Sequence, residues 1–88
     1  MNDELLVLQQ RVNGLIYNPF INLKDQLKEI KKLLSDEEKY SAELLKISTA
    51  LNALEAFELL PYGNLERIKG FNKIKSNTLR LIKELLTL

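Results

Sequence analysis

Apolar side chains recur every three or four residues along almost the whole chain, and this spacing constrains the fold more than any other feature. At 3.6 residues per turn, such positions fall on one face of an α-helix, whereas a half-buried strand needs strict alternation. No stretch of any length alternates in that way. The sequence therefore predicts an all-α protein. The stripes run through Leu5, Leu8, Val12, Leu15 and Ile16, through Leu23, Leu27, Ile30 and Leu34, and through Tyr40, Leu44, Ile47, Leu51 and Leu54.

Turn-forming and capping residues divide the first half of the chain into helices. Pro19 disfavours helical backbone in the residue before it, so the 17–19 segment is expected to end a first helix over about 3–16. A second helix is expected to begin near Asn22. Ser35 and Glu38 have the spacing of a capping box, which would mark the end of the second helix and the start of the third.

The third helix, expected over about 36–59, is followed by a turn at residues 60–64. Pro61 cannot continue a helix, Gly63 tolerates positive φ, and Asn64 can cap the next helix. Four amphipathic helices joined by short loops favour an antiparallel four-helix bundle.

The last helix carries two apolar series that are out of phase. The step of five residues from Ile74 to Leu79 turns the apolar face by about 140°. Either this helix is bent or broken near Ser76-Asn77, or its C-terminal half packs on a different neighbour. We expect the bend or break, because either residue can cap a new helix. The two series are Leu65, Ile68, Phe71 and Ile74, and then Leu79, Ile82 and Leu86.

Residue types that are absent limit the chemistry. With 88 residues, 45% of them apolar, the chain is expected to form one helical-bundle domain over 1–88. It has no cysteine, which excludes disulfides and thiolate sites, and no histidine, the commonest general base and metal ligand. Glu55 and Glu58, one turn apart, are interpreted as a solvated acidic face. We expect no enzyme, no catalytic residues, no cofactor, no metal and no small-molecule substrate.

The chain has no segment of the kind that crosses or targets a membrane. The longest uninterrupted apolar run covers residues 5–8, whereas a span needs about twenty residues. Asn2-Asp3-Glu4 is acidic where a signal peptide would be basic. We expect a cytoplasmic protein, either free or peripheral at the inner face of the membrane.

Charge is segregated between the last two predicted helices. Residues 36–66 carry seven acidic and two basic side chains, a net charge of −5, and residues 67–88 carry a net charge of +5. Either antiparallel neighbours carry complementary charge, or the basic segment binds an acidic partner or an anionic membrane surface. A net charge of +1 for the whole chain argues against nucleic acid as a partner. The candidate partner-binding residues are Tyr62, Arg67, Lys69, Lys73, Lys75, Arg80 and Lys83.

The aromatic residues are expected to differ in exposure. Tyr40 and Phe57 lie on the stripe of the third helix and are predicted to belong to the core. Tyr17 and Phe20 flank the Asn-Pro turn and are predicted to pack under it. Tyr62, between two helix breakers, is predicted to be exposed.

The segment Leu-Ile-Tyr-Asn-Pro-Phe-Ile at residues 15–21 lies between a leucine-rich first helix and a Lys/Glu/Leu-rich second helix. In this it resembles the immunity proteins of pediocin-like (class IIa) bacteriocins, the enterocin A immunity type. The similarity covers about residues 4–75, and the LIYNP stretch is its most suggestive part. The resemblance implies a bacterial cytoplasmic four-helix bundle that protects the producer cell from its own bacteriocin.

The resemblance also implies a partner. In this family the immunity protein binds the membrane part of the mannose phosphotransferase permease once the bacteriocin has occupied it, and blocks the lethal pore from inside the cell. The C-terminal half of the family determines which bacteriocin is recognised, which corresponds here to residues 62–88 and includes the basic side chains named above. Many relatives carry an extended tail after the fourth helix, whereas this sequence stops at Leu88. If recognition in the family needs contacts from that tail, the site here would have to lie on the bundle itself.

A second hypothesis is a non-enzymatic interaction bundle, such as an adaptor or a small dimerising protein. Its interface would use apolar residues that the core stripes do not need, namely Leu6, Val7, Leu33, Leu45 and Leu59. Both hypotheses describe a protein that works by binding, as a monomer or a weak dimer.

Overall fold

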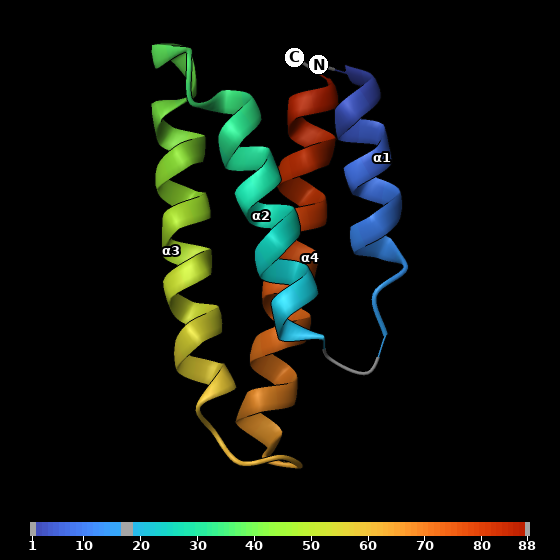
Figure 1. Cartoon of the computed structure of the whole chain (residues 1–88), viewed down its shortest axis with the longest axis vertical. Coiled ribbons are helices and arrows are strands. Elements are labelled where there is room, and N and C mark those ends of the chain that lie inside the picture. Colours follow the sequence, from blue (N-terminus) through green and yellow to red (C-terminus); the bar gives the residue numbers. More distant parts are fainter. Residues whose placement is uncertain (1, 17–18, 88) are drawn as a thin grey trace.

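Residues 2–16 and 19–87 are described by a computed structural model, and within them every regular element is helical (Figure 1). The all-α prediction is therefore confirmed. The elements are α1 (Asn2–Asn13), α2 (Phe20–Leu34), the short 3-10 helix η1 (Glu38–Tyr40), α3 (Ser41–Glu58) and α4 (Leu65–Leu86).

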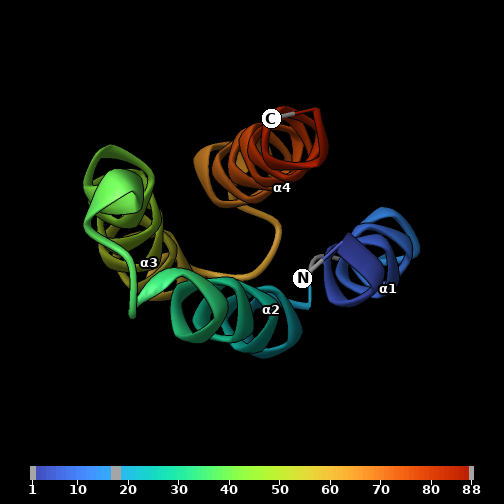
Figure 2. The same cartoon turned by 90° about the horizontal axis from the view of Figure 1, so that it is seen from above.

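Consecutive α-helices run in opposite directions, so the beginning of α1 and the end of α4 lie at the same end of the molecule (Figure 1). Seen along the bundle, the four helices follow one another in chain order around a ring, so that α1 lies beside α4 (Figure 2). Packing follows the ring, because α4 contacts both α1 and α3, and α2 contacts α3 and α1. The structure confirms the predicted antiparallel four-helix bundle.

The core is a single cluster of buried residues drawn from all four helices. The predicted stripe of α2 is buried throughout, at Leu23, Leu27, Ile30 and Leu34. At one end of the bundle, Phe20 meets Phe71 of α4 edge to face, with ring centroids 5.2 Å apart, which is a favoured arrangement for aromatic rings. Tyr40 is buried, as predicted, and Phe57 is half-buried against the core.

The helix α4 is continuous from Leu65 to Leu86, so the predicted break near Ser76-Asn77 is wrong. Its buried face includes Arg67, Gly70 and Thr78, which keep the spacing of three and four residues unbroken between the apolar members. The hydroxyl of Thr78 donates to the carbonyl of Ile74 at 2.7 Å, so its polar group is satisfied within the helix. The apparent change of phase arose because the second apolar series used the half-buried Leu79 and Leu86 and omitted Leu81 and Leu85, which are buried and in phase with Ile74.

Three helix boundaries differ from those predicted. α1 ends at Asn13, before Gly14, rather than near residue 16, so Ile16 lies beyond the helix and is exposed. α2 begins at Phe20, two residues earlier than expected. The Ser35 hydroxyl donates to the carbonyl of Lys32 at the end of α2 and does not cap α3, which starts at Ser41 after η1. The predicted packing of Tyr17 lies outside the described residues.

The turn between α3 and α4 forms as the sequence predicted. Gly63 has φ of +81°, a conformation that costs glycine little. The side-chain oxygen of Asn64 accepts hydrogen bonds from the backbone N–H groups of Glu66 and Arg67, at 2.8 and 3.2 Å. This cap fixes where α4 begins and hence the position of the basic residues along it.

Candidate functional site: a groove between α3 and α4

The helix α3 is the least buried of the three longer helices. Only Ile47 and Leu54 are fully buried among its 18 residues, whereas α2 buries five of 15. Its remaining apolar residues lie half-buried at the edge of the core or project into solvent, and Leu45 is 70% exposed. A helix that is apolar beyond its core-facing stripe carries surface that a partner can bury.

Beside this surface, an open groove of about 660 Å³ runs between α3 and α4. Its floor is apolar and includes Ile47 and Ile74. The groove is elongated, because the lining residues of α3 extend from Leu45 to Phe57, a span of about 18 Å at 1.5 Å per residue. One row of side chains comes from α3, with Lys46, Ala50 and Ala53, and the facing row comes from α4, with Lys73, Asn77, Arg80 and Glu84.

One end of the groove is closed by a close contact between the two helices. A Cβ atom added at Gly70 would lie 2.5 Å from the ring of Phe57. The glycine therefore allows this ring to lie directly against the backbone of α4. Beyond Phe57, the small side chains of Ala53 and Ala50 leave the apolar floor accessible.

The rim of the groove is positively charged. Lys46, Lys73 and Arg80 are exposed at its edge, with Glu84 as the acidic member. Within residues 2–16 and 19–87, none of these four side chains takes part in an ion pair. The rim therefore presents uncompensated positive charge beside an apolar floor.

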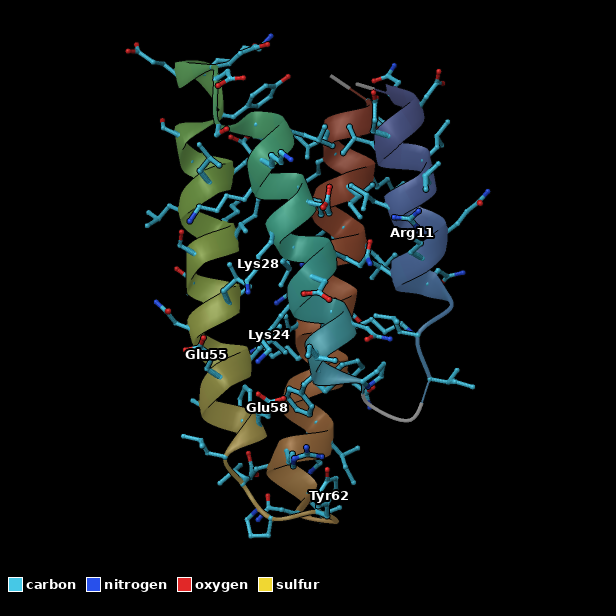
Figure 3. All side chains as sticks on the ribbon, in the orientation of Figure 1. Arg11, Lys24, Lys28, Glu55, Glu58 and Tyr62 are labelled. Atoms are coloured by element: carbon cyan, nitrogen blue, oxygen red, sulfur yellow. The ribbon has the colours of Figure 1, made fainter. Side chains whose placement is uncertain are left out.

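Among the described residues, the one ion pair that α3 makes is with α2. Lys24 donates to the Glu58 carboxylate at 2.8 Å, and Lys28 and Glu55 lie along the same side of the bundle (Figure 3). The hydrogen bond from Lys24 to Glu58 raises the pKa of the lysine. Among the described residues, no ion pair joins α3 to α4. Direct pairing between the acidic and basic helices, the first interpretation of their charge, therefore has no contact to support it.

Of the predicted partner-binding residues, Tyr62 and Arg67 lie outside the groove. Tyr62 is 91% exposed, as expected. Arg67 is buried to 9% exposure, and its guanidinium carbon lies 4.6 Å from the centroid of the Phe20 ring and 4.4 Å from that of Tyr62. It therefore connects the start of α2 to the turn before α4 and is not part of a solvated surface.

The lysines of α4 also divide into groups. Lys75 is half-buried and donates to the carbonyl of Leu15 at 2.8 Å, which ties α4 to the segment after α1. Lys69 and Lys83 are exposed away from the groove. Of the seven predicted residues, Lys73 and Arg80 line the groove.

The sequence did not single out the α3 side of the groove, formed by Lys46, Ala50 and Ala53. The sequence feature that could have identified it was the presence of apolar residues on the third helix that the core stripe does not need, such as Leu45. Leu45 lies on the groove, whereas Leu6, Val7 and Leu59 are exposed elsewhere on the bundle. Leu33 is half-buried against the core.

No helix within residues 2–16 and 19–87 is both long and apolar enough to cross a membrane. The same part of the chain contains no group of three or more acidic side chains arranged to hold a metal ion.

Comparison of the chain with protein-family models, with curated proteins and with solved structures finds no match.

Proposed function

We propose that this protein is a bacteriocin immunity protein of the class IIa type, which acts by binding and performs no reaction. The observation that carries the proposal is the groove between α3 and α4, with its apolar floor and the basic residues Lys73 and Arg80. The resemblance at residues 15–21 implies that recognition resides in the C-terminal half of the chain. A groove built by the last two helices is a binding surface in that half.

The bundle itself also supports the proposal. The resemblance implies an antiparallel four-helix bundle, which is the architecture of this chain. Under the proposal, the protein works from the cytoplasm and occupies the complex between the bacteriocin and the membrane part of the mannose phosphotransferase permease. Apolar contacts in the groove supply affinity, and the basic rim orients an acidic partner and speeds its approach.

The test is survival of a bacteriocin-sensitive strain that expresses the chain during challenge with a panel of class IIa peptides. We expect protection against one peptide or a small subset, because recognition by an immunity protein is specific. An unrelated four-helix protein expressed at the same level is the control. Equal killing of both strains by every peptide of the panel would contradict the proposal.

A general interaction bundle is the second candidate, and the exposure of Leu45 beside the groove favours it. For its self-associating form, light scattering at high concentration is the informative measurement. A dimer that dissociates when Leu45 is replaced by Lys would support this candidate, and a strict monomer would exclude its self-associating form.

A further inference from the structure

We propose that the groove between α3 and α4 binds an amphipathic helix of a partner protein, whose apolar stripe is flanked on one side by acidic residues. This inference rests on the proposed function only in treating the chain as a binding protein. It assigns the chemistry of the partner from the groove itself.

The shape of the groove fits a helix. Two antiparallel helices form its walls, and the lining extends over about three turns of α3. An elongated apolar cleft between two helices accepts the apolar face of a third, through side chains spaced by three and four residues. The small side chains of Ala50 and Ala53 allow close approach of another helix along the α3 wall.

The charges on the rim specify the flank of the incoming helix. Lys73 and Arg80 are seven residues apart on α4, so they project from the same side of that helix about two turns apart. Both are exposed and unpaired within the described part of the chain. A helix lying along α4 meets both cations when it carries acidic residues one heptad apart.

Lys46 adds a cation on the opposite wall. Phe57 packs on Gly70, and the two helices run antiparallel. Lys46, eleven residues before Phe57, is therefore at the same height along the bundle as Leu81, eleven residues after Gly70. This places Lys46 near Arg80 and Glu84. The rim thus carries three cations and one anion, and the cations on α4 face the ligand without competition from an ion pair. Charge complementarity therefore selects an acidic helix over a basic one.

The experiment selects binders from a library of helical 18-residue peptides displayed on phage, with the full chain immobilised. The peptides have fixed leucines at three- and four-residue spacing, and their flanking positions are randomised among Glu, Gln and Lys. We expect enrichment of Glu over Lys, with two Glu one heptad apart on one flank. Enrichment of Lys, or no enrichment at all, would overturn the inference.

The binding constant of the enriched peptide then locates its site. The K73E/R80E pair should weaken binding by about tenfold or more, whereas K69E/K83E should change it by less than about threefold. Both pairs make the same charge change on α4, but only the first lies on the groove. Equal effects would show long-range attraction without docking and would contradict the inference.

A second pair of variants tests the apolar floor without changing charge. Ala53→Trp fills the groove and should abolish peptide binding, while Ala56→Trp, exposed on α3 outside the groove, should leave it intact. Circular dichroism verifies that both variants keep the helical content of the parent. Binding retained by the folded Ala53→Trp variant would overturn the inference.

Other occupants give different results. A dimer that Ala53→Trp converts to a monomer would place a second copy in the groove. The chain could instead bind phosphatidylglycerol vesicles. If K73E/R80E abolished that binding and Ala53→Trp did not affect it, the basic rim would be a membrane-binding surface. Either result overturns the inference. Because these assays contain neither bacteriocin nor permease, their failure is distinguishable from failure of cell protection.

Discussion

The guanidinium carbon of Arg67 lies 4.4 Å from the centroid of the Tyr62 ring and 4.6 Å from that of the Phe20 ring. The cation therefore contacts two aromatic faces, although Arg67 Nε is buried and has no hydrogen-bond partner among residues 2–16 and 19–87. Attraction to the rings offsets part of the cost of removing the charge from water. The exposed Tyr62 ring thus contributes to stability by covering Arg67.

Replacing Tyr62 tests this contact. Tyr62→Ala removes one of the two aromatic faces and should lower the free energy of unfolding by about 0.5–2 kcal/mol. Tyr62→Phe keeps the ring and should leave stability unchanged. Urea unfolding measures both, and an equal loss of stability in the two variants would show that the ring over Arg67 does not stabilise the fold.

Gly70→Ala should destabilise the bundle, although alanine favours helix over glycine by about 1 kcal/mol. The added Cβ would lie 2.5 Å from the Phe57 ring, and overpacking of this kind costs about 1–3 kcal/mol. In a Phe57→Ala background the clash is absent, so the same substitution should become stabilising. Thermal unfolding of the four proteins provides the comparison, and an effect of the same sign in both backgrounds would rule out the clash.

Lys75 should differ from the other lysines of α4 in its effect on stability. It donates to the carbonyl of Leu15 at 2.8 Å, and loss of such a bond costs about 1–3 kcal/mol. Lys75→Met should therefore lower the free energy of unfolding, whereas Lys69→Met and Lys73→Met should change it by less than about 0.5 kcal/mol. Chemical denaturation of the three variants checks this, and equal values would contradict the assigned role of Lys75.

The ion pair between Lys24 and Glu58 should give a pH-dependent coupling. Because the folded pKa of Lys24 is raised, its contribution is fully present below the unfolded value of about 10.4 and is lost as pH rises through the folded value. A double-mutant cycle with Lys24→Met and Glu58→Gln should give a coupling of about 0.5 kcal/mol near pH 7. That coupling should vanish in the alkaline range, and a coupling independent of pH would be inconsistent with this pair.

Ser76→Ala reports whether α4 is continuous in solution. In an unbroken helix the exposed Ser76 is an interior position, where alanine should stabilise by about 0.5 kcal/mol. At a helix start it would be a capping residue, and its loss would cost about 1 kcal/mol. The sign of the change in melting temperature therefore distinguishes one helix from two.

The sequence predicted the four helices and their order because each apolar stripe depends only on the spacing of nearby residues, which is three or four. It misjudged α4 because the second apolar series used the half-buried Leu79 and Leu86 and omitted the buried Leu81 and Leu85. The buried face also includes Arg67, Gly70 and Thr78, whose burial depends on the residues that pack against them. Arg67 is covered by rings from two other segments, and Gly70 by Phe57 of α3. Such contacts between segments distant in sequence are not visible in the periodicity of a single helix.

The candidate site was predictable only on its charged side. Lys73 and Arg80 belong to a basic segment that composition reveals, whereas Ala50 and Ala53 are ordinary residues of an apolar stripe. They are accessible because they line the groove between α3 and α4. A groove between two helices depends on how those helices pack, so it could not be predicted from either helix alone.

The most direct test combines the groove with the proposed function, through survival of a bacteriocin-sensitive strain that expresses the chain or one of two matched variants. Cells with the parent chain or Ala56→Trp should survive the cognate class IIa peptide, and cells with Ala53→Trp, at equal expression and helical content, should die. Equal survival with both variants would contradict the claim that the groove between α3 and α4 is where this protein acts.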